Sequence, residues 1–428
     1  MSTLPGLSDD ELDHHDPAFV ADPWPTYQHL RRDRPVSHSN RYGGFWLITR
    51  YDDVVAAAAD WSRFTSAVPG TLLIPSGMQR SFAFLPLEYD PPEHTVYRQL
   101  VAPVFSPRRV NALTGEIRSL AEQLLDPLLA AGGGDLATAF AAPLTSGALA
   151  LFIGLPDEDK SLWVDLVRRS FEGSVRDHED AARADAEFRD YIDGLIAARR
   201  ENRSDDLISL LLDSEVEGHT LTEDQIRGFT MLVLVAGHET TAAALSYALW
   251  HLARYPADLE RLREDRALIP SAVEEFLRLS SPVSIFARNA ASDTEFQGCP
   301  MSAGEIVGLS FSSANRDEEH FDAPETCRLD RRPNRHLAFG SGIHFCLGAQ
   351  MARRELSVAL DVVLDSGRSL ALDGEACRKG RGGAMPSPWP TCRSASGRSS
   401  AGRPTRRPAD AADVRPPTPA PPHGGETP

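Results

Sequence analysis

Apolar residues recur at a spacing near 3.6 over most of the chain between residues 93 and 266, which predicts a largely helical body. The spacing is clearest over residues 113–129 and 181–200. Short apolar runs predict strands at residues 45–48, which follow two glycines, and within residues 283–307. Further helices are expected over residues 51–61, 269–279 and 349–364. The pattern therefore predicts a mainly α fold, with one large helical body and small β-sheets.

The longest predicted helix begins at a capping box, in which Thr222 is the N-cap and Gln225 occupies the third helical position. It continues to about residue 254, a length of roughly 45–50 Å. Apolar residues surround it, so it should be buried. Its middle, residues 236–241 (AGHETT), combines small residues with an acid and hydroxyls, which predicts a kink that opens a groove.

Two interpretations of that central segment remain open. Glu239 and Thr240 could deliver protons to a small molecule in the groove. Alternatively, the segment is a packing kink and Glu239 turns to solvent.

The sharpest local pattern is residues 339–348 (FGSGIHFCLG). Its glycines allow the backbone to approach a flat ligand closely. Cys346 precedes a predicted helix, and the N–H groups of a first helical turn lower the pKa of such a thiol. A thiolate in this setting suits haem iron with one axial sulfur. A buried structural cysteine is the alternative, whereas zinc would need more ligands than the neighbouring His344 provides.

Charged side chains with helical spacing form two further candidate pairs. Glu275 and Arg278 are three residues apart, and His94 and Arg98 are four apart. Such pairs usually lie on a solvent-exposed face and contribute only about 0.2–0.5 kcal/mol. The cations, together with Arg288 in a strand-like run, could instead bind carboxylates.

Composition narrows the class of protein. The 428 residues include 44 basic and 61 acidic ones, a net charge of −17, which argues against a nucleic-acid partner. Five widely spaced cysteines favour reduced, cytosolic thiols over a disulfide framework. The acidic start of the chain is not expected to be a signal peptide, and no run of about 18 apolar residues predicts a membrane span.

Residues 381–428 differ from the rest of the chain. Their 48 positions hold eleven prolines, six glycines, seven basic and three acidic residues, with almost no large aliphatic side chains. Such a segment cannot bury enough apolar surface to offset its ordering entropy. We therefore expect one domain over residues 1–380 and a disordered tail after it.

Taken together and in order, these motifs resemble the cytochrome P450 superfamily, in particular the soluble bacterial haem-thiolate monooxygenases. The resemblance covers about residues 16–372. The matching pieces are residues 90–98 (DPPEHTVYR), 236–241, 275–278 (EFLR), Arg288, 314–317 (ANRD), and 339–348 followed by 352–353 (AR). Residues 43–46 (GGFW) and 154–156 (GLP) favour the camphor-hydroxylase-like branch.

The resemblance implies haem b as the cofactor and Cys346 as its axial metal ligand. Glu239 and Thr240 are implied as the catalytic acid–alcohol pair that guides protons to oxygen. Glu275 and Arg278 are implied as a buried structural pair, completed by Arg332 or Arg335. The other implied cofactor-binding residues are His94, Arg98, Arg288 and His344 at the haem propionates, with Ala236, Phe339, Gly340 and Gly348.

Position alone suggests the substrate pocket. Its expected residues are Phe82, Phe84, Leu87, Leu232, Val235, Ser284, Ile285 and Phe286. All but Ser284 are apolar, so a hydrophobic small molecule with few polar groups fits best. Camphor hydroxylase has a substrate-binding tyrosine where Phe82 stands, which disfavours camphor here. We expect hydroxylation or epoxidation of a terpenoid or polyketide-type natural product in secondary metabolism.

Electrons are expected to come from a separate protein, because these residues contain no recognisable flavin or iron–sulfur module. The resemblance implies a ferredoxin and its reductase as donors, with O2 as co-substrate. Arg98, Arg108, Arg109 and Arg353 could form a basic patch that steers an acidic ferredoxin. The protein is expected to be a cytoplasmic monomer.

The end of the chain departs from the family pattern. Family members usually close with a β-hairpin whose Leu-Pro strand reaches the pocket, whereas the sequence after residue 380 has low complexity. A reading-frame shift near residue 380 and a natural disordered extension are the two explanations. If the last strands are replaced, the alternative function is a haem-binding homologue with an impaired or non-catalytic role.

Overall fold

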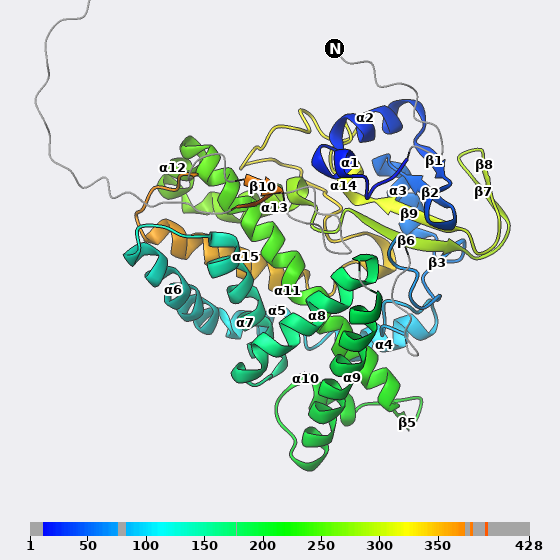
Figure 1. The fold of residues 1–428 in the computed structure, drawn as a ribbon, viewed down its shortest axis with the longest axis horizontal. Helices are drawn as coiled ribbons and strands as arrows, with labels where there is room; N and C mark the ends of the chain where they lie inside the picture. Colours follow the sequence, from blue (N-terminus) through cyan, green and yellow to red (C-terminus); the bar gives the residue numbers. More distant parts are fainter. Residues whose placement is uncertain (1–11, 76–82, 177, 373–376, 380–389, 393–428) are drawn as a thin grey trace, which may run out of the picture.

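The computed structural model describes residues 12–75, 83–176, 178–372, 377–379 and 390–392. It is 58% helical with small sheets, which confirms the predicted fold class (Figure 1). The helices are α1 (Pro17–Ala21), α2 (Trp24–Asp33), α3 (Tyr51–Ala59), α4 (Glu93–Val101), α5 (Pro107–Ala112), α6 (Thr114–Ala130), α7 (Ala142–Ile153), α8 (Lys160–Arg176), α9 (His178–Glu201), α10 (Leu207–Leu212), α11 (Glu223–Arg254), α12 (Pro256–Glu264), α13 (Ile269–Ser280), α14 (Phe311–Ala314) and α15 (Ala349–Asp365).

The principal sheet has five strands in the order β1-β2-β9-β6-β3, and it lies to one side of the helices (Figure 1). Strands β2 and β9 are parallel, while the other neighbours are antiparallel. The strands of the model are β1 (Val36–Ser39), β2 (Phe45–Ile48), β3 (Phe64–Thr65), β4 (Glu215–Val216), β5 (His219–Thr220), β6 (Ile285–Ala290), β7 (Thr294–Phe296), β8 (Cys299–Met301), β9 (Ile306–Ser310), β10 (Cys377–Lys379) and β11 (Pro390–Cys392). This topology brings β6 beside β9, so that β6 can supply residues to the cavity described below.

Helix α11 is the central element of the helical body (Figure 1). It begins with the expected capping box, in which the Thr222 side chain accepts from the Gln225 N–H and Gln225 reaches back to the Thr222 N–H. By length and composition α11 could cross a bilayer, but 61% of its most apolar window is buried inside the protein. Such burial is typical of a core helix, and it places the middle of α11 where a site can be built.

The predicted tail falls mostly outside the described residues. Within it the structure describes only β11, which pairs antiparallel with β10. A short strand therefore stands at Pro390–Cys392, where the composition predicts disorder.

Candidate functional site

A cavity of about 260 Å³ lies between α11 and the loop that precedes α15. Ala236 and Thr240 line it from α11, and Phe339, Gly340 and Cys346 line it from that loop. Strand β6 and helix α4 add further side chains to the wall. Motifs far apart in the sequence thus meet around one space.

The wall from α11 follows the periodicity of the helix. It comprises Phe229, Leu232, Val233, Ala236, Gly237, Thr240 and Thr241. From Val233 onward these positions are spaced at i, i+3, i+4, i+7 and i+8, which places them on one face. Val235 was expected in this wall, but it is buried on another face and does not line the cavity.

The helix is not interrupted at residues 236–241, contrary to the sequence-based expectation. The Thr240 hydroxyl donates to the Ala236 carbonyl oxygen at 2.9 Å, so the hydroxyl adds a bond to the helical turn rather than replacing one. A Cβ on Gly237 would come within 2.9 Å of the Leu149 side chain of α7. The small residues therefore permit close helix packing, and the groove arises from packing rather than from a break.

Glu239 and Thr240 are neighbours with different surroundings. Thr240 lines the cavity, whereas Glu239 is exposed and does not contribute to its wall. A step of one residue rotates a side chain about 100° around the helix, and Glu239 falls outside the arc that carries Ala236, Thr240 and Thr241. The alcohol therefore faces the cavity, and the acid does not.

Cys346 is held by the backbone of its loop. Its N–H donates to the Phe339 carbonyl oxygen at 2.8 Å, and the N–H groups of Gly348 and Ala349 bond to its sulfur. Burial raises the pKa of the thiol, and it outweighs the lowering by these N–H groups and by Arg98. The expected lowering at the helix N-terminus is thus wrong as a net effect, because desolvation penalises the thiolate more than two N–H groups favour it.

Two glycines in the loop have positive φ angles, 71° at Gly340 and 68° at Gly342. A Cβ on Gly342 would lie only 2.5 Å from the Ala58 carbonyl oxygen of α3. A Cβ on Gly340 would lie no closer than 3.9 Å to any protein atom. The close approach at Gly342 is therefore to the protein itself, while Gly340 contributes backbone conformation to the cavity wall.

Four basic side chains gather at one edge of the cavity, and we call them the cavity cations. They are His94 and Arg98 of α4, Arg288 of β6, and His344 of the loop. Arg98, Arg288 and His344 line the cavity, and the His94 and His344 ring centres are 4.6 Å apart. The predicted convergence of these residues is thus present in the structure.

The cavity cations have few partners. Both ring nitrogens of His94 and Nε2 of His344 are buried without a hydrogen-bond partner. The one nearby carboxylate among the described residues is Asp90, whose Oδ1 lies 4.0 Å from His344 Nε2. Burial lowers the pKa of Arg288 to about 10, and burial together with the neighbouring cations lowers the pKa of His344 to about 2.

Buried cations and unpaired ring nitrogens require acceptors, because their desolvation is otherwise unfavourable. Two carboxylates on the edge of a flat ligand would supply them. With a cysteine sulfur elsewhere in the same wall, the donor set fits the haem that the resemblance implies.

The expected pocket residues divide into three groups. Leu87, Leu232 and Phe286 line the cavity. Phe84, Val235, Ser284 and Ile285 are buried elsewhere, and Phe82 lies outside the described residues. For Ile285 the reason is the alternation of β6, which directs it away from the face that carries Phe286 and Arg288.

The sequence analysis missed several wall residues. Val233, Gly237 and Thr241 share the helical spacing of Ala236 and Thr240, so that spacing could have identified them. Phe105 and Phe152 also line the cavity, but they come from segments with no recognisable motif. Only the tertiary packing places those two rings here.

The Glu275–Arg278 pair lies outside the cavity wall and is fully buried. Both Arg278 bonds to the carboxylate are 2.8 Å long, and Nε of Arg331 donates to both carboxylate oxygens at 3.0 Å. The completing arginine is therefore Arg331, not Arg332 or Arg335, both of which are exposed. The surface-pair alternative is wrong as well, because neither member of the pair reaches solvent.

Comparison with known proteins gives concordant results. The family model described as "Cytochrome P450" matches residues 163–368. The chain is 36% identical to the polyketide biosynthesis cytochrome P450 PksS of Bacillus subtilis, covering 82% of this chain and 89% of PksS. The solved structure of PksS superposes with a TM-score of 0.80 at 33% sequence identity, covering 90% of this chain and 99% of that one.

Two further relatives have printed activities. The chain is 36% identical to the cyclomarin C epoxidase CymV of Salinispora arenicola, covering 78% of this chain and 86% of CymV. It is 35% identical to the cytochrome P450 monooxygenase PikC of Streptomyces venezuelae, covering 83% and 86% respectively.

Proposed function

Because the chain belongs to the cytochrome P450 superfamily, we propose that it oxidises a hydrophobic natural product, of polyketide or terpenoid type, by hydroxylation or epoxidation. The protein is a haem b-dependent monooxygenase, as its family and its monooxygenase relatives show. What is proposed here concerns the residues, the substrate and the electron donors.

We assign the haem to the cavity, where Cys346 would supply the thiolate ligand and the cavity cations would be partners of the propionates. The observation that carries this assignment is that a cysteine sulfur lines the same cavity as Arg98, Arg288 and His344, where buried ring nitrogens of His94 and His344 have no hydrogen-bond partner. Ala236, Phe339, Gly340 and Gly348 would contact the macrocycle. When bound, haem supplies the iron on which O2 is activated.

The chain's own part in catalysis is proton delivery. The Thr240 hydroxyl donates to the Ala236 carbonyl oxygen, and this bond holds it at the cavity wall. The hydroxyl oxygen can still accept a hydrogen bond from a proton donor. Glu239, the preceding residue, is exposed and can exchange protons with water. Transfer from Glu239 through ordered water to Thr240 would bring protons into a site that is otherwise dry.

The substrate class follows from the wall. Leu87, Phe105, Phe152, Leu232 and Phe286 are apolar, and they offer a substrate contact area but few hydrogen bonds. The printed names of PksS and CymV, a polyketide-biosynthesis protein and an epoxidase, support a natural-product substrate and one of the two proposed reactions. The camphor-hydroxylase-like branch stays a prediction.

We further propose a ferredoxin and its reductase as electron donors, in the cytoplasm. The basic patch expected for ferredoxin is smaller than the sequence suggests. Arg353 binds Glu274 and Arg109 pairs with Asp205, while Arg98 belongs to the cavity. Arg108 is exposed, and no ion pair is recorded for it among the described residues.

The assignment of Thr240 is tested by coupling, the fraction of NAD(P)H consumption that yields oxidised product. Thr240→Ala is expected to keep haem and substrate binding but to lower coupling about tenfold or more, because the proton donor is lost. Thr240→Ser restores the hydroxyl and should restore most of the coupling. Unchanged coupling in Thr240→Ala would contradict the assignment.

Substrate and ligand are tested by spectroscopy. The reduced carbon monoxide complex should show the thiolate signature in the wild type and lose it in Cys346→Ser. Candidate polyketides and terpenoids are then screened for a spectral shift of the bound haem. Product formation by a hit would exclude the alternative of a non-catalytic haem protein.

A further inference from the structure

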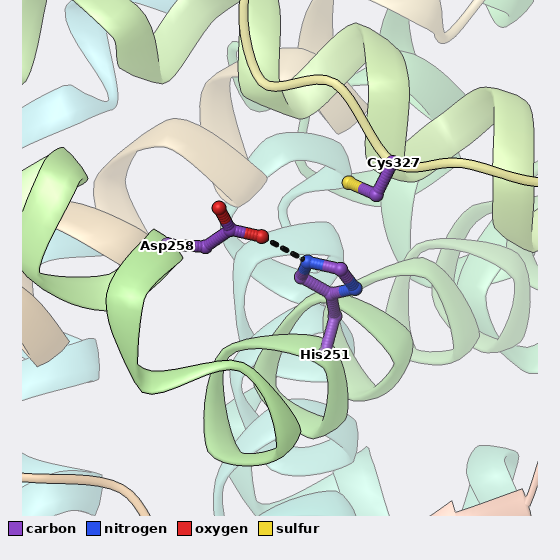
Figure 2. Close-up of side chains that lie close together, drawn as sticks. All are labelled: His251, Asp258 and Cys327. Carbon is purple, nitrogen blue, oxygen red and sulfur yellow. Dashed lines mark hydrogen bonds and ion pairs between the residues drawn. The ribbon is translucent and has the colours of Figure 1, made fainter. Parts of the chain in front are cut away.

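Three side chains with metal-binding atoms meet where α11 ends and α12 begins (Figure 2). His251 belongs to the last turn of α11, Asp258 to the first turn of α12, and Cys327 to the loop after α14. One ligand atom from each lies within 4.8 Å of the others. None of the three lines the cavity, so the catalytic site does not explain their convergence.

The helical corner fixes two of the three side chains. His251 is buried, and its Nε2 is 2.7 Å from Oδ2 of Asp258. The Tyr255 ring packs against the imidazole at 4.6 Å between ring centres, and the Tyr255 carbonyl accepts the Asp258 N–H at 3.0 Å. The imidazole and the carboxylate therefore hold their positions before any ligand arrives.

The buried arginine network fixes the third. On one side of Cys327, the Thr326 carbonyl accepts from Nη2 of Arg331 at 3.0 Å. On the other side, the Arg328 N–H donates to Oε1 of Glu275 at 2.9 Å. The backbone that carries the thiol is thus held at both ends, which is the condition for a preorganised site.

We propose that His251, Asp258 and Cys327 form a binding site for a zinc-class divalent cation, with water as the fourth ligand. Imidazole nitrogen, carboxylate oxygen and thiolate sulfur are the donors that Zn²⁺ accepts in tetrahedral sites. Ca²⁺ and Mg²⁺ require oxygen donors, so this mixed set selects against them. The proposal is independent of the monooxygenase function.

Proton accounting gives the site a distinctive property. The cation replaces the His251–Asp258 hydrogen bond, the imidazole proton moves from Nε2 to Nδ1, and the Cys327 thiol releases one proton to water. Burial and the charges of Glu275 and Asp258 raise the pKa of the Cys327 thiol, against the lowering by Arg278 and Arg331, and the thiol must lose its proton to bind the cation as a thiolate. The affinity should therefore rise with pH by about tenfold per unit around neutrality.

The experiment uses the full-length, untagged holoenzyme, in which haem occupies Cys346. Cys377 and Cys392 are replaced by Ser throughout, because these two further soft ligands are partners in register across β10 and β11 and could bind a cation together. After treatment with a chelator, the protein is titrated with Cd²⁺ and with Zn²⁺, and bound metal is counted by mass spectrometry. Cadmium NMR then reports whether sulfur, nitrogen and oxygen are ligands.

We expect one equivalent of metal, one proton released and a mixed-ligand cadmium signal. Residues that only hydrogen-bond to a metal ligand change metal affinity by roughly 10–100-fold. Because Cys327 is proposed to be a ligand itself, Cys327→Ser should weaken binding by more than that. Cys299→Ser, at the other partly buried free cysteine, is the matched control and should bind as the parent does. Asp258→Asn, at a partly exposed ligand, provides a second variant should Cys327→Ser fold poorly.

Absence of a stoichiometric site would overturn the proposal, as would binding that survives both Cys327→Ser and Asp258→Asn. A pH-independent affinity would also contradict it, because no thiol proton would then be displaced. In each of these cases His251 and Asp258 form only a hydrogen-bonded pair, and Cys327 is a core thiol beside it.

Discussion

Two groups of buried basic side chains in this protein differ in one respect, which is whether the protein supplies their partners. Arg278 and Arg331 share the Glu275 carboxylate and fill their remaining donors with backbone carbonyls. The cavity cations have no such set, and three of their ring nitrogens are buried without any partner. Buried polar groups whose partners come from the protein therefore belong to the framework of this molecule, and buried polar groups without partners lie where a ligand must complete the site.

The difference also explains the direction of the pKa shifts. Burial alone would raise the pKa of Glu275, but Arg278 and Arg331 outweigh it and the pKa is lowered. At Arg288 burial is opposed only weakly by the charge of Asp90, and the pKa falls to about 10. Glu275 stays charged because two arginines pair with it. The charged form of Arg288 would instead be stabilised by an anionic ligand.

The largest effect on stability is expected from a substitution in the ion-pair network of Glu275, Arg278 and Arg331. Arg278→Ala removes one of the two arginines that bind the buried Glu275 carboxylate, and it should lower the free energy of unfolding by about 3–5 kcal/mol. Urea denaturation followed by circular dichroism measures this. Arg332→Ala, at an exposed neighbour in the same segment, should change stability by no more than about 0.5 kcal/mol. Equal stabilities for the two variants would remove the distinction.

The second-largest effect is expected from a substitution among the cavity cations. Arg288→Met should accelerate haem dissociation about 10–100-fold, since a charged hydrogen bond to a propionate is lost. Transfer of haem to an excess of a scavenging globin measures the rate. Arg31→Met is the matched control, because Arg31 is equally buried but binds Glu318 and Ser313 outside the cavity. The comparison fails if both variants release haem at the same rate.

A third effect is the acid dependence of a paired carboxylate nearer the surface. Burial raises the pKa of Glu274, but its bonds to Arg353 and His336 lower it to about 2, from an ordinary 4.5. The folded state then binds fewer protons than the unfolded state. The stabilisation is complete above pH 4.5 and is lost as the pH falls toward 2. Urea unfolding across this range should show a steeper loss for the wild type than for Glu274→Gln.

The smallest effect concerns cations at the surface. With Arg353 and Arg109 neutralised by acids, little more than Arg108 remains of the expected patch, so raising the ionic strength should slow reduction by ferredoxin only a few-fold. Stopped-flow reduction at increasing salt measures this, and Arg108→Gln should reduce the dependence. A rate that does not respond to salt would discard electrostatic steering.

The sequence alone determined the elements whose causes are local. The periodicity of apolar residues, the Thr222 capping box and the glycine loop before Cys346 each depend on a few neighbouring residues. That is why the long helix begins at Glu223 as expected and why the fold class is confirmed. The same motifs identified which residues meet at the cavity, because their order along the chain resembles one family.

Tertiary structure decided what depends on direction and burial. The arginine that completes the Glu275 network is Arg331, not Arg332 or Arg335. Val233 lines the cavity, whereas Val235 does not. Phe105 and Phe152 line it as well, although their segments carry no motif. It also reversed the expected pKa shift of Cys346, because desolvation depends on everything that surrounds the sulfur. Local spacing fixes which side chains share a face, but only the packed chain fixes what that face meets.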